Sequence, residues 1–219
     1  YVRTALDQGD FTVADAFNEQ STGESAIDHS AGSSLVVCDL SGAQLASICV
    51  FDAACSGVTP QGRTYGGAGT LHTGNLRYRY HISDGQISCD VSSIEVYFPE
   101  SDICRPLDFH KAYSTSFTFE SSQNLVSLLP WASKMATGQA LPFAPYDEAT
   151  GTYMDVPSDN KSEEYYRFWA PYCRGKGVLE GTSYELKSWT ALYYYAASMN
   201  GTLSDAYTPD HLMQTRIQG

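Results

Sequence analysis

Polar and hydrophobic residues alternate in the middle of the chain, which is the pattern of half-buried β-strands. The clearest run covers residues 76–82 and is followed by an Asp-Gly pair at 84–85, a pair typical of tight hairpin turns. A second alternating run covers 87–98, and its alternation slips by one residue at 92–93. The pattern therefore predicts a β-hairpin whose second strand carries a β-bulge and ends before Pro99.

Shorter runs rich in Tyr, Thr, Val and Phe predict further strands on either side of this hairpin. They begin at residue 35 and include 117–119, 124–129, 165–169, 178–186 and 189–198. Helix signals are weak and limited to 13–17 and to a short stretch around Pro106. About eight short strands with almost no helix predict an all-β fold, an eight-stranded antiparallel jelly-roll sandwich with long loops and an extended N-terminal arm.

The composition along the chain predicts three parts. They are a polar N-terminal arm without a core of its own (1–34), the jelly-roll domain (35–205) and a C-terminal tail (206–219). Within the domain, residues 130–160 are rich in Pro and Gly and predict a long loop. Because a loop of this length in a compact domain is usually functional or covered by a partner, we expect it to make contacts between subunits through Trp131, Phe143, Tyr146, Tyr153 and Met154.

The overall composition excludes several classes of protein. Of the 219 residues, 42% are hydrophobic and 17% are charged, a balance that excludes a wholly disordered chain. No apolar run is long enough for a membrane-spanning helix, and the start at Tyr1, with neither Met nor an apolar leader, predicts no signal peptide. The net charge of −12 provides no basic arm for phosphates or for an anionic membrane surface.

Cysteines and histidines show no strong metal-binding pattern. The six cysteines include no pair with the short spacing of zinc ligands, and we expect most of them to be free thiols, with disulfides as the alternative. His72 and His81 have no further ligand nearby in the sequence. His81 follows Arg77 and Arg79 on the polar side of its strand, which favours a solvent-facing position.

The Gly-rich and acidic segments also lack the pattern of a phosphate-binding site or of a catalytic acid/base pair. Residues 65–70 are Gly-rich but precede a strand, whereas a phosphate cradle precedes a helix. Glu163 and Glu164 would face opposite sides of a strand and could not act as an acid/base pair. Calcium binding by a loop is an alternative that the sequence does not exclude, through the carboxylates of Asp155, Asp159 and Glu163. We therefore expect no catalytic, cofactor-binding or metal-binding residues, no cofactor and no enzyme activity.

An aromatic stripe and two glycosylation triplets leave two interpretations open. The stripe consists of Tyr165, Tyr166, Phe168, Trp169 and Tyr172. It favours a core or an interface between subunits, and a sugar-binding face is the alternative. Asn160 and Asn200 each begin an Asn-x-Ser/Thr triplet, which would carry glycans in a secreted protein.

Four segments, in order, resemble strands of the jelly-roll capsid proteins of picorna-like positive-strand RNA viruses. They are 71–80 (LHTGNLRYRY), 94–99 (IEVYFP), 123–133 (QNLVSLLPWAS) and 189–204, which is centred on YYYAAS. The third segment is similar to a strand of this family that ends in Pro-Trp/Tyr-x-Ser. The resemblance covers about residues 70–204 of the chain.

This resemblance implies a structural subunit of an icosahedral viral capsid, cut from a polyprotein, that forms a shell around the RNA genome by packing against other subunits. The implied partners are other capsid proteins in homo- and hetero-oligomeric contacts, the enclosed viral RNA without a basic arm, and a host receptor. The implied location is the virion, assembled in the host cytoplasm. The alternative is a secreted carbohydrate-binding or glycoside-hydrolysing β-sandwich protein.

Overall fold

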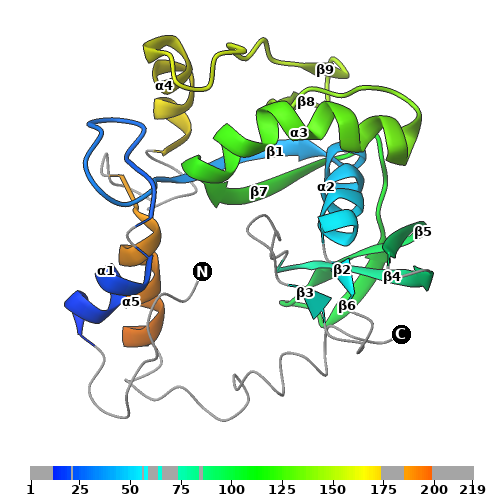
Figure 1. The fold of residues 1–219 in the computed structure, drawn as a ribbon, viewed down its shortest axis with the longest axis horizontal. Coiled ribbons are helices and arrows are strands. Elements are labelled where there is room, and N and C mark those ends of the chain that lie inside the picture. Colours follow the sequence, from blue (N-terminus) through cyan, green and yellow to red (C-terminus); the bar gives the residue numbers. More distant parts are fainter. Residues whose placement is uncertain are drawn as a thin grey trace. The chain divides into compact units, whose positions relative to one another are not determined.

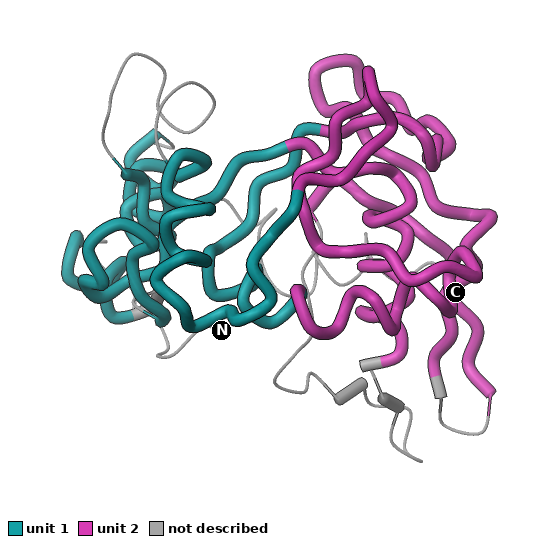
Figure 2. Tube along the Cα trace, turned by 90° about the horizontal axis from the view of Figure 1, so that it is seen from above, with its two compact units in different colours: residues 1–38, 114–125, 155–212 teal, residues 39–113, 126–154, 213–219 magenta. Residues whose placement is uncertain are grey.

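A computed structural model describes residues 12–20, 22–55, 57–58, 64–65, 74–83, 86–173 and 185–198 of the chain. The chain divides into two compact units that are interleaved in the sequence (Figure 2). Unit 1 comprises residues 1–38, 114–125 and 155–212, and unit 2 comprises 39–113, 126–154 and 213–219. Each unit is therefore assembled from segments that lie far apart in the sequence.

Unit 2 contains the antiparallel hairpin that the alternation predicts, extended by a third strand (Figure 1). The strands are β4 (Leu76–Ser83), β5 (Gln86–Phe98) and β6 (Ile103–Pro106), in the order β4-β5-β6. The strands of the hairpin and the end of β5 before Pro99 are confirmed. The short helix expected around Pro106 is wrong, because these residues pair with β5 as an edge strand, where a proline is tolerated.

The predicted β-bulge is present in β5. Arg77 of β4 lies opposite Glu95, whereas Arg79, two residues further along β4, lies opposite Asp90. The shift in register leaves residues 91–94 of β5 facing a single residue of β4. The bulge expected at 92–93 is therefore confirmed, and it explains why apolar residues change sides along β5.

The other described strands form three separate two-stranded sheets. They are β1 (Leu35–Ser41) with β7 (Ala112–Thr118), β2 (Gly57–Val58) with β3 (Thr64–Tyr65), and β8 (Tyr146–Asp147) with β9 (Thr152–Tyr153). These small sheets are combined with α-helices throughout the described part of the chain. The predicted all-β, eight-stranded antiparallel jelly-roll sandwich is therefore wrong, because several apolar and tyrosine-rich runs that predicted strands are helices.

Helix α2 (Gly42–Cys55) is not indicated by any alternation in the sequence. It is apolar on nearly all sides, which is typical of a helix buried over most of its surface. Ala46 and Cys49 pack with Ile94 of β5 in the core of unit 2, and Leu76 and Tyr78 of β4 pack against them. The helix therefore covers one side of the three-stranded sheet.

Helix α3 (Phe119–Thr137) lies where the sequence predicted a strand at 124–129 and the start of a loop at 130. The Thr118 hydroxyl accepts a hydrogen bond of 3.2 Å from the backbone N–H of Ser121, which caps the helix at its N-terminus. Gly138, with a φ of +80°, ends the helix in the left-handed conformation that glycine favours. Pro130 lies inside the helix, where it removes one backbone donor without ending the helix.

Helices α4 (Glu163–Trp169) and α5 (Ser188–Ser198) also replace predicted strands. The Ser162 hydroxyl accepts a hydrogen bond from the backbone N–H of Tyr165 and caps α4, and the 3₁₀ turn η1 (Ala170–Cys173) follows it. Glu163 and Glu164 lie in the first turn of α4, where carboxylates favourably face the helix dipole. Their expected positions on opposite sides of a strand are therefore wrong. The strand expected at 178–186 falls largely outside the described residues.

The aromatic stripe forms part of the core of unit 1. Tyr165 and Trp169 are fully buried, and Tyr166 is nearly so. The Tyr165 hydroxyl donates a hydrogen bond of 3.0 Å to Ser122 of α3, and Trp169 packs edge-on against Phe117 with 5.7 Å between the ring centroids. The interpretation of the stripe as core is confirmed for these residues.

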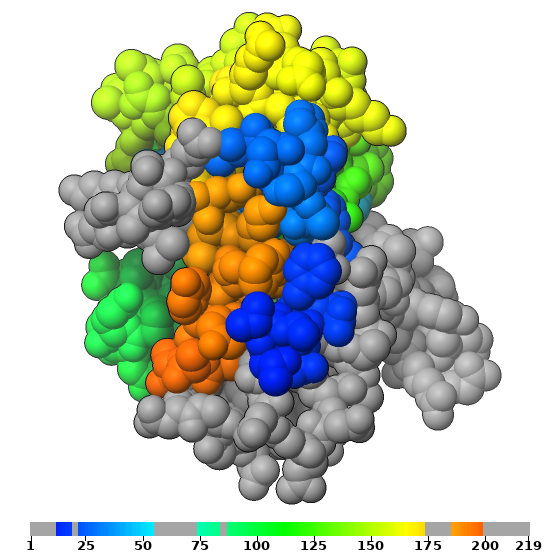
Figure 3. Space-filling model, turned by 90° about the vertical axis from the view of Figure 1, so that its left-hand side faces the viewer, coloured from blue at the N-terminus to red at the C-terminus, as the bar shows by residue number. Residues whose placement is uncertain are grey.

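Helix α1 (Val13–Gln20) confirms the helix signal at 13–17. The Thr12 and Asp15 side chains cap it reciprocally, each accepting a hydrogen bond from the other residue's backbone N–H. Figure 3 shows α1 beside α5 on the surface of unit 1, where Phe17 packs edge-on against Trp189. The domain boundaries at residues 34 and 205 stay predictions, and the C-terminal tail (206–219) lies outside the described residues.

Phe143 is buried within its own chain, so its expected position at an interface is wrong. The side chain is 1% exposed and belongs to the core of unit 2. The amide Nε2 of Gln44, near the start of α2, donates hydrogen bonds of 2.8 Å to the backbone carbonyls of Pro142 and Ala144. These bonds hold the segment around Phe143 against the rest of the unit.

Candidate functional site

Residues 22–34 of unit 1 form a tight loop with an unusual backbone. Glu24 and Ala31 pair in a single antiparallel bridge. Gly23 and Gly32 have φ angles of +74° and +97°, which glycine adopts without steric cost. His29 also has a positive φ, +58°, which is uncommon for a residue with a side chain. Such conformations are frequent at functional sites, which makes this loop a candidate.

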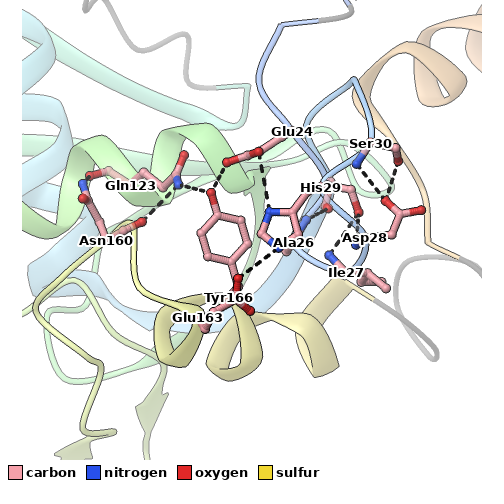
Figure 4. Close-up of polar contacts among 12 residues, drawn as sticks. Glu24, Ala26, Ile27, Asp28, His29, Ser30, Gln123, Asn160, Glu163 and Tyr166 are labelled. Atoms are coloured by element: carbon pink, nitrogen blue, oxygen red, sulfur yellow. Dashed lines mark hydrogen bonds and ion pairs between the residues drawn. The ribbon is translucent and has the colours of Figure 1, made fainter.

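The loop places the His29 imidazole between two carboxylates (Figure 4). Its Nδ1 lies 3.6 Å from Glu24 of the loop, and its Nε2 lies 3.4 Å from Glu163 of α4. The ring also stacks on Tyr166 of α4, with 4.6 Å between the centroids. A protonated imidazole can donate to both carboxylates at once, so His29 connects the loop to α4.

A second set of hydrogen bonds extends from Tyr166 to α3 (Figure 4). The Tyr166 hydroxyl donates to Glu24 and accepts a bond of 3.1 Å from Nε2 of Gln123. Gln123 Nε2 also donates to the backbone carbonyl of Asn160, whose own amide donates to the backbone carbonyl of Gln123. Burial, together with the bond to Glu24, raises the pKa of Tyr166 to about 12. The Tyr166 phenol therefore stays protonated near neutral pH and acts here as a hydrogen-bonding group.

The loop is also connected to the segment that precedes α5. The Ser25 and Ser34 hydroxyls donate to the Glu185 carboxylate. Lys187 donates to the Ser30 hydroxyl and to the backbone carbonyl of Ala31. Because Ser25 and Ser34 are fully buried, these bonds satisfy polar groups that would otherwise be costly to bury.

Asp28 stabilises the shape of the loop through hydrogen bonds from the nearby residue Ser30. Its carboxylate accepts hydrogen bonds from both the hydroxyl and the backbone N–H of Ser30. These bonds lower the pKa of Asp28 from 3.8 to about 2, and Lys187 adds a smaller effect in the same direction. The contribution of Asp28 to stability is therefore present above pH 3.8 and is lost as the pH falls through about 2.

We expect the amide proton resonance of Ser30 to titrate with a midpoint near pH 2 in the folded protein. The carboxylate that accepts its hydrogen bond becomes protonated only there. The measurement is a two-dimensional NMR titration downward from pH 5, and Asp28→Asn should remove the transition. A midpoint at the ordinary value of 3.8 would show that the Ser30 bonds do not hold the carboxylate.

The polar cluster around His29 joins the loop to α3 and α4. Within the described part of the chain, no three His, Cys, Asp or Glu side chains come close enough to hold a metal ion. The calcium set that the sequence left open (Asp155, Asp159 and Glu163) is therefore not assembled, and Glu163 faces His29 instead. Since the side chains of His29 and both glutamates are exposed to water by 42–69%, each ion pair contributes at most about 1 kcal/mol when His29 is protonated.

An exposed apolar stripe on α3 is the second candidate site. It consists of Leu128, Trp131 and Met135, whose side chains are 37%, 53% and 59% exposed. The spacing i, i+3, i+7 places all three along one face of the helix. The buried face of the helix adjoins the stripe and includes Leu125, Leu129 and Ala132. The apolar surface of α3 thus extends beyond the part that is covered within the chain.

The structure places several other candidate residues without bringing them into a site. His81 is exposed on β4, as its alternation predicts, and His110 is exposed in the turn before β7. His72, His211, Asn200 and most of the Gly-rich stretch lie outside the described residues. The sequence patterns did not predict the cluster of Glu24, His29, Gln123 and Tyr166. The glycines at 23 and 32, near the two ends of the loop, were a signal that could have indicated its unusual backbone.

The five cysteines whose side chains the structure describes carry thiols, which confirms the expectation that most of the six are not in disulfides. They are Cys38, Cys49, Cys89, Cys104 and Cys173. Burial raises the pKa of Cys49, and it raises that of Cys89 to about 12. These two thiols therefore stay protonated near neutral pH and are poor nucleophiles.

None of the helices in the described residues is both long and apolar enough to cross a membrane. Comparison of the chain with known protein families, with curated proteins and with solved structures gives no match.

Proposed function

We propose that this protein is a structural subunit that works by associating with other protein subunits through the exposed stripe of α3 (Leu128, Trp131 and Met135). The shell of an icosahedral RNA virus is the specific assembly that the sequence resemblance suggests. Because α3 and α5 are helices where the resemblance requires strands, the proposal rests on the stripe and not on the jelly-roll fold. We assign no catalytic step to the protein.

The stripe carries the proposal because it leaves large apolar side chains in water. Trp131 and Met135 each expose more than half of their side chains, one turn apart on a rigid helix. Tryptophan and methionine are enriched in protein interfaces relative to the rest of the surface. Covering these residues with another subunit would remove the unfavourable apolar exposure, at roughly 25 cal/mol per Å².

A sugar-binding protein is less well supported by the described residues. Three of the five side chains of the aromatic stripe, Tyr165, Tyr166 and Trp169, are buried in the core of unit 1 and are not available to stack on a sugar. The amide of Asn160, which a secreted protein would offer for glycosylation, donates to the backbone of α3. Neither observation favours the secreted alternative.

Trp131→Ala is expected to weaken association by about 30-fold, because a tryptophan at the centre of an interface typically contributes about 2 kcal/mol. The measurement is sedimentation velocity over a range of protein concentrations. Met154→Ala serves as the matched control, since Met154 is 47% exposed in the same unit but lies outside the stripe. Circular dichroism should show unchanged folding in both variants.

Equal association of the wild type and both variants would contradict the proposed role of the stripe. Electron microscopy of negatively stained native material tests the more specific proposal of a viral shell. Closed particles of uniform diameter would support it, and the absence of closed particles in associating material would restrict the proposal to an open assembly.

A further inference from the structure

We propose that the stripe of α3 binds the same stripe of a second copy of this chain, with the two helices antiparallel around a two-fold axis near Trp131. This inference rests on the proposed function and names the partner in that association. It concerns the residues of α3 that belong to unit 2, from 126 onward.

The order of residues along the stripe is self-complementary. Leu128 and Met135 lie on either side of the midpoint of the stripe, each displaced by about 5 Å along the helix axis at 1.5 Å per residue. When a second helix is placed antiparallel around that midpoint, Leu128 of one copy meets Met135 of the other, and the two Trp131 rings meet near the axis. A two-fold interface requires such a patch, because the same surface is used on both copies.

The charge of the chain favours this face for self-association over the rest of the surface. With a net charge of −12, two copies repel each other at most orientations. From residue 121 to residue 137, however, α3 contains no carboxylate, and its one charged side chain is that of Lys134. Two copies can therefore approach along this part of α3 without bringing carboxylates of the two helices together.

The size of the stripe limits the strength of a single contact. Three side chains on one helix cover much less than the ~800 Å² per partner of a standard stable interface. We therefore expect a weak, concentration-dependent dimer on its own. In a larger assembly, the same contact repeated many times gains strength because each further contact forms within an already connected particle.

Disulfide trapping tests the antiparallel arrangement. We expect a mixture of the Leu128→Cys and Met135→Cys variants to form a covalent dimer under mild oxidation, because these positions face each other across the axis. Each variant alone should form little covalent dimer, since its own two sulfurs lie about 10 Å apart along the axis. The wild type, with its native thiols, is the control for background cross-linking.

The outcomes separate this inference from the proposed function. Equal trapping within each single variant would overturn the antiparallel arrangement. Absence of trapping in the mixture, while Trp131→Ala still weakens assembly, would overturn self-pairing and leave a different subunit as the partner of the stripe. Absence of trapping together with no effect of Trp131→Ala would overturn both proposals.

Discussion

Replacing Gly42 with alanine is expected to destabilise the protein by about 3 kcal/mol, near the upper end of the usual cost of overpacking. A Cβ atom at this position would lie 2.0 Å from the backbone carbonyl oxygen of Asp108 and 3.0 Å from the Cα of Phe109. Neither atom can move like a flexible side chain, because Gly42 and Ala43 donate backbone hydrogen bonds to Lys111 and Phe109. The start of α2 and the segment before β7 would have to separate.

The measurement for Gly42→Ala is the free energy of unfolding from a urea titration, with the slope of the transition used to check two-state behaviour. Gly74→Ala is the matched control, since a Cβ at Gly74 has no atom within 4 Å. We expect this control to change the stability by less than about 0.5 kcal/mol. Similar losses in both variants would contradict the close approach of the two backbones at Gly42.

Gln44→Glu is expected to cost about 3 kcal/mol or more at neutral pH. Gln44 is fully buried, its Oε1 accepts a 2.8 Å hydrogen bond from the backbone N–H of Ser41, and its Nε2 donates to the carbonyls of Pro142 and Ala144. A carboxylate cannot donate to these carbonyls, which would be left unsatisfied at about 1–3 kcal/mol each. It would also introduce a buried charge without a cationic partner.

The pH dependence of this variant provides a second test. Burial would raise the pKa of the introduced carboxyl above its unfolded value, so the penalty should be present in full above the folded pKa and shrink as the pH falls toward about 4.3. Gln139→Glu makes the same chemical change at an exposed position of unit 2 and should leave stability nearly unchanged. A pH-independent loss in Gln44→Glu would argue against a buried carboxylate.

The hairpin of β4 and β5 was predictable because its residues are half-buried, so the alternation of the sequence follows the two sides of the sheet. The bulge was predictable for the same reason, since it appears as a slip in that alternation. The jelly-roll prediction is wrong because several of the shorter apolar and tyrosine-rich runs that it treats as strands are helices. Alternation in one segment predicts a local strand, but it does not determine how many other strands join it.

The helices were missed for separate physical reasons. In α3, Leu125, Leu129 and Ala132 follow a helical period, but a proline after an apolar run is typical of the end of a strand. Here α3 continues through Pro130. In α5, a row of tyrosines has high β propensity, and the tertiary context overrides it. In α2, apolar residues on nearly all sides hide the period altogether.

The two candidate sites differ in how far the sequence could reveal them. The stripe of α3 is local, so its i, i+3, i+7 spacing would have been visible once the segment was recognised as a helix. The cluster around His29 joins the loop to Glu163 and Tyr166 from a distant part of the sequence. No local pattern specifies such a contact, because it forms only when α4 packs beside the loop.

The buried thiol of Cys49 makes the protein a reporter of its own unfolding. Cys49 has no exposed surface, and its raised pKa keeps it protonated, so an alkylating reagent can reach a reactive thiolate only after unit 2 opens. The rate of alkylation at this residue, followed by mass spectrometry, would therefore measure the opening of the α2 core without any introduced label. Applied to Gly42→Ala and Gln44→Glu, it would locate their effects within the unit as well as quantify them.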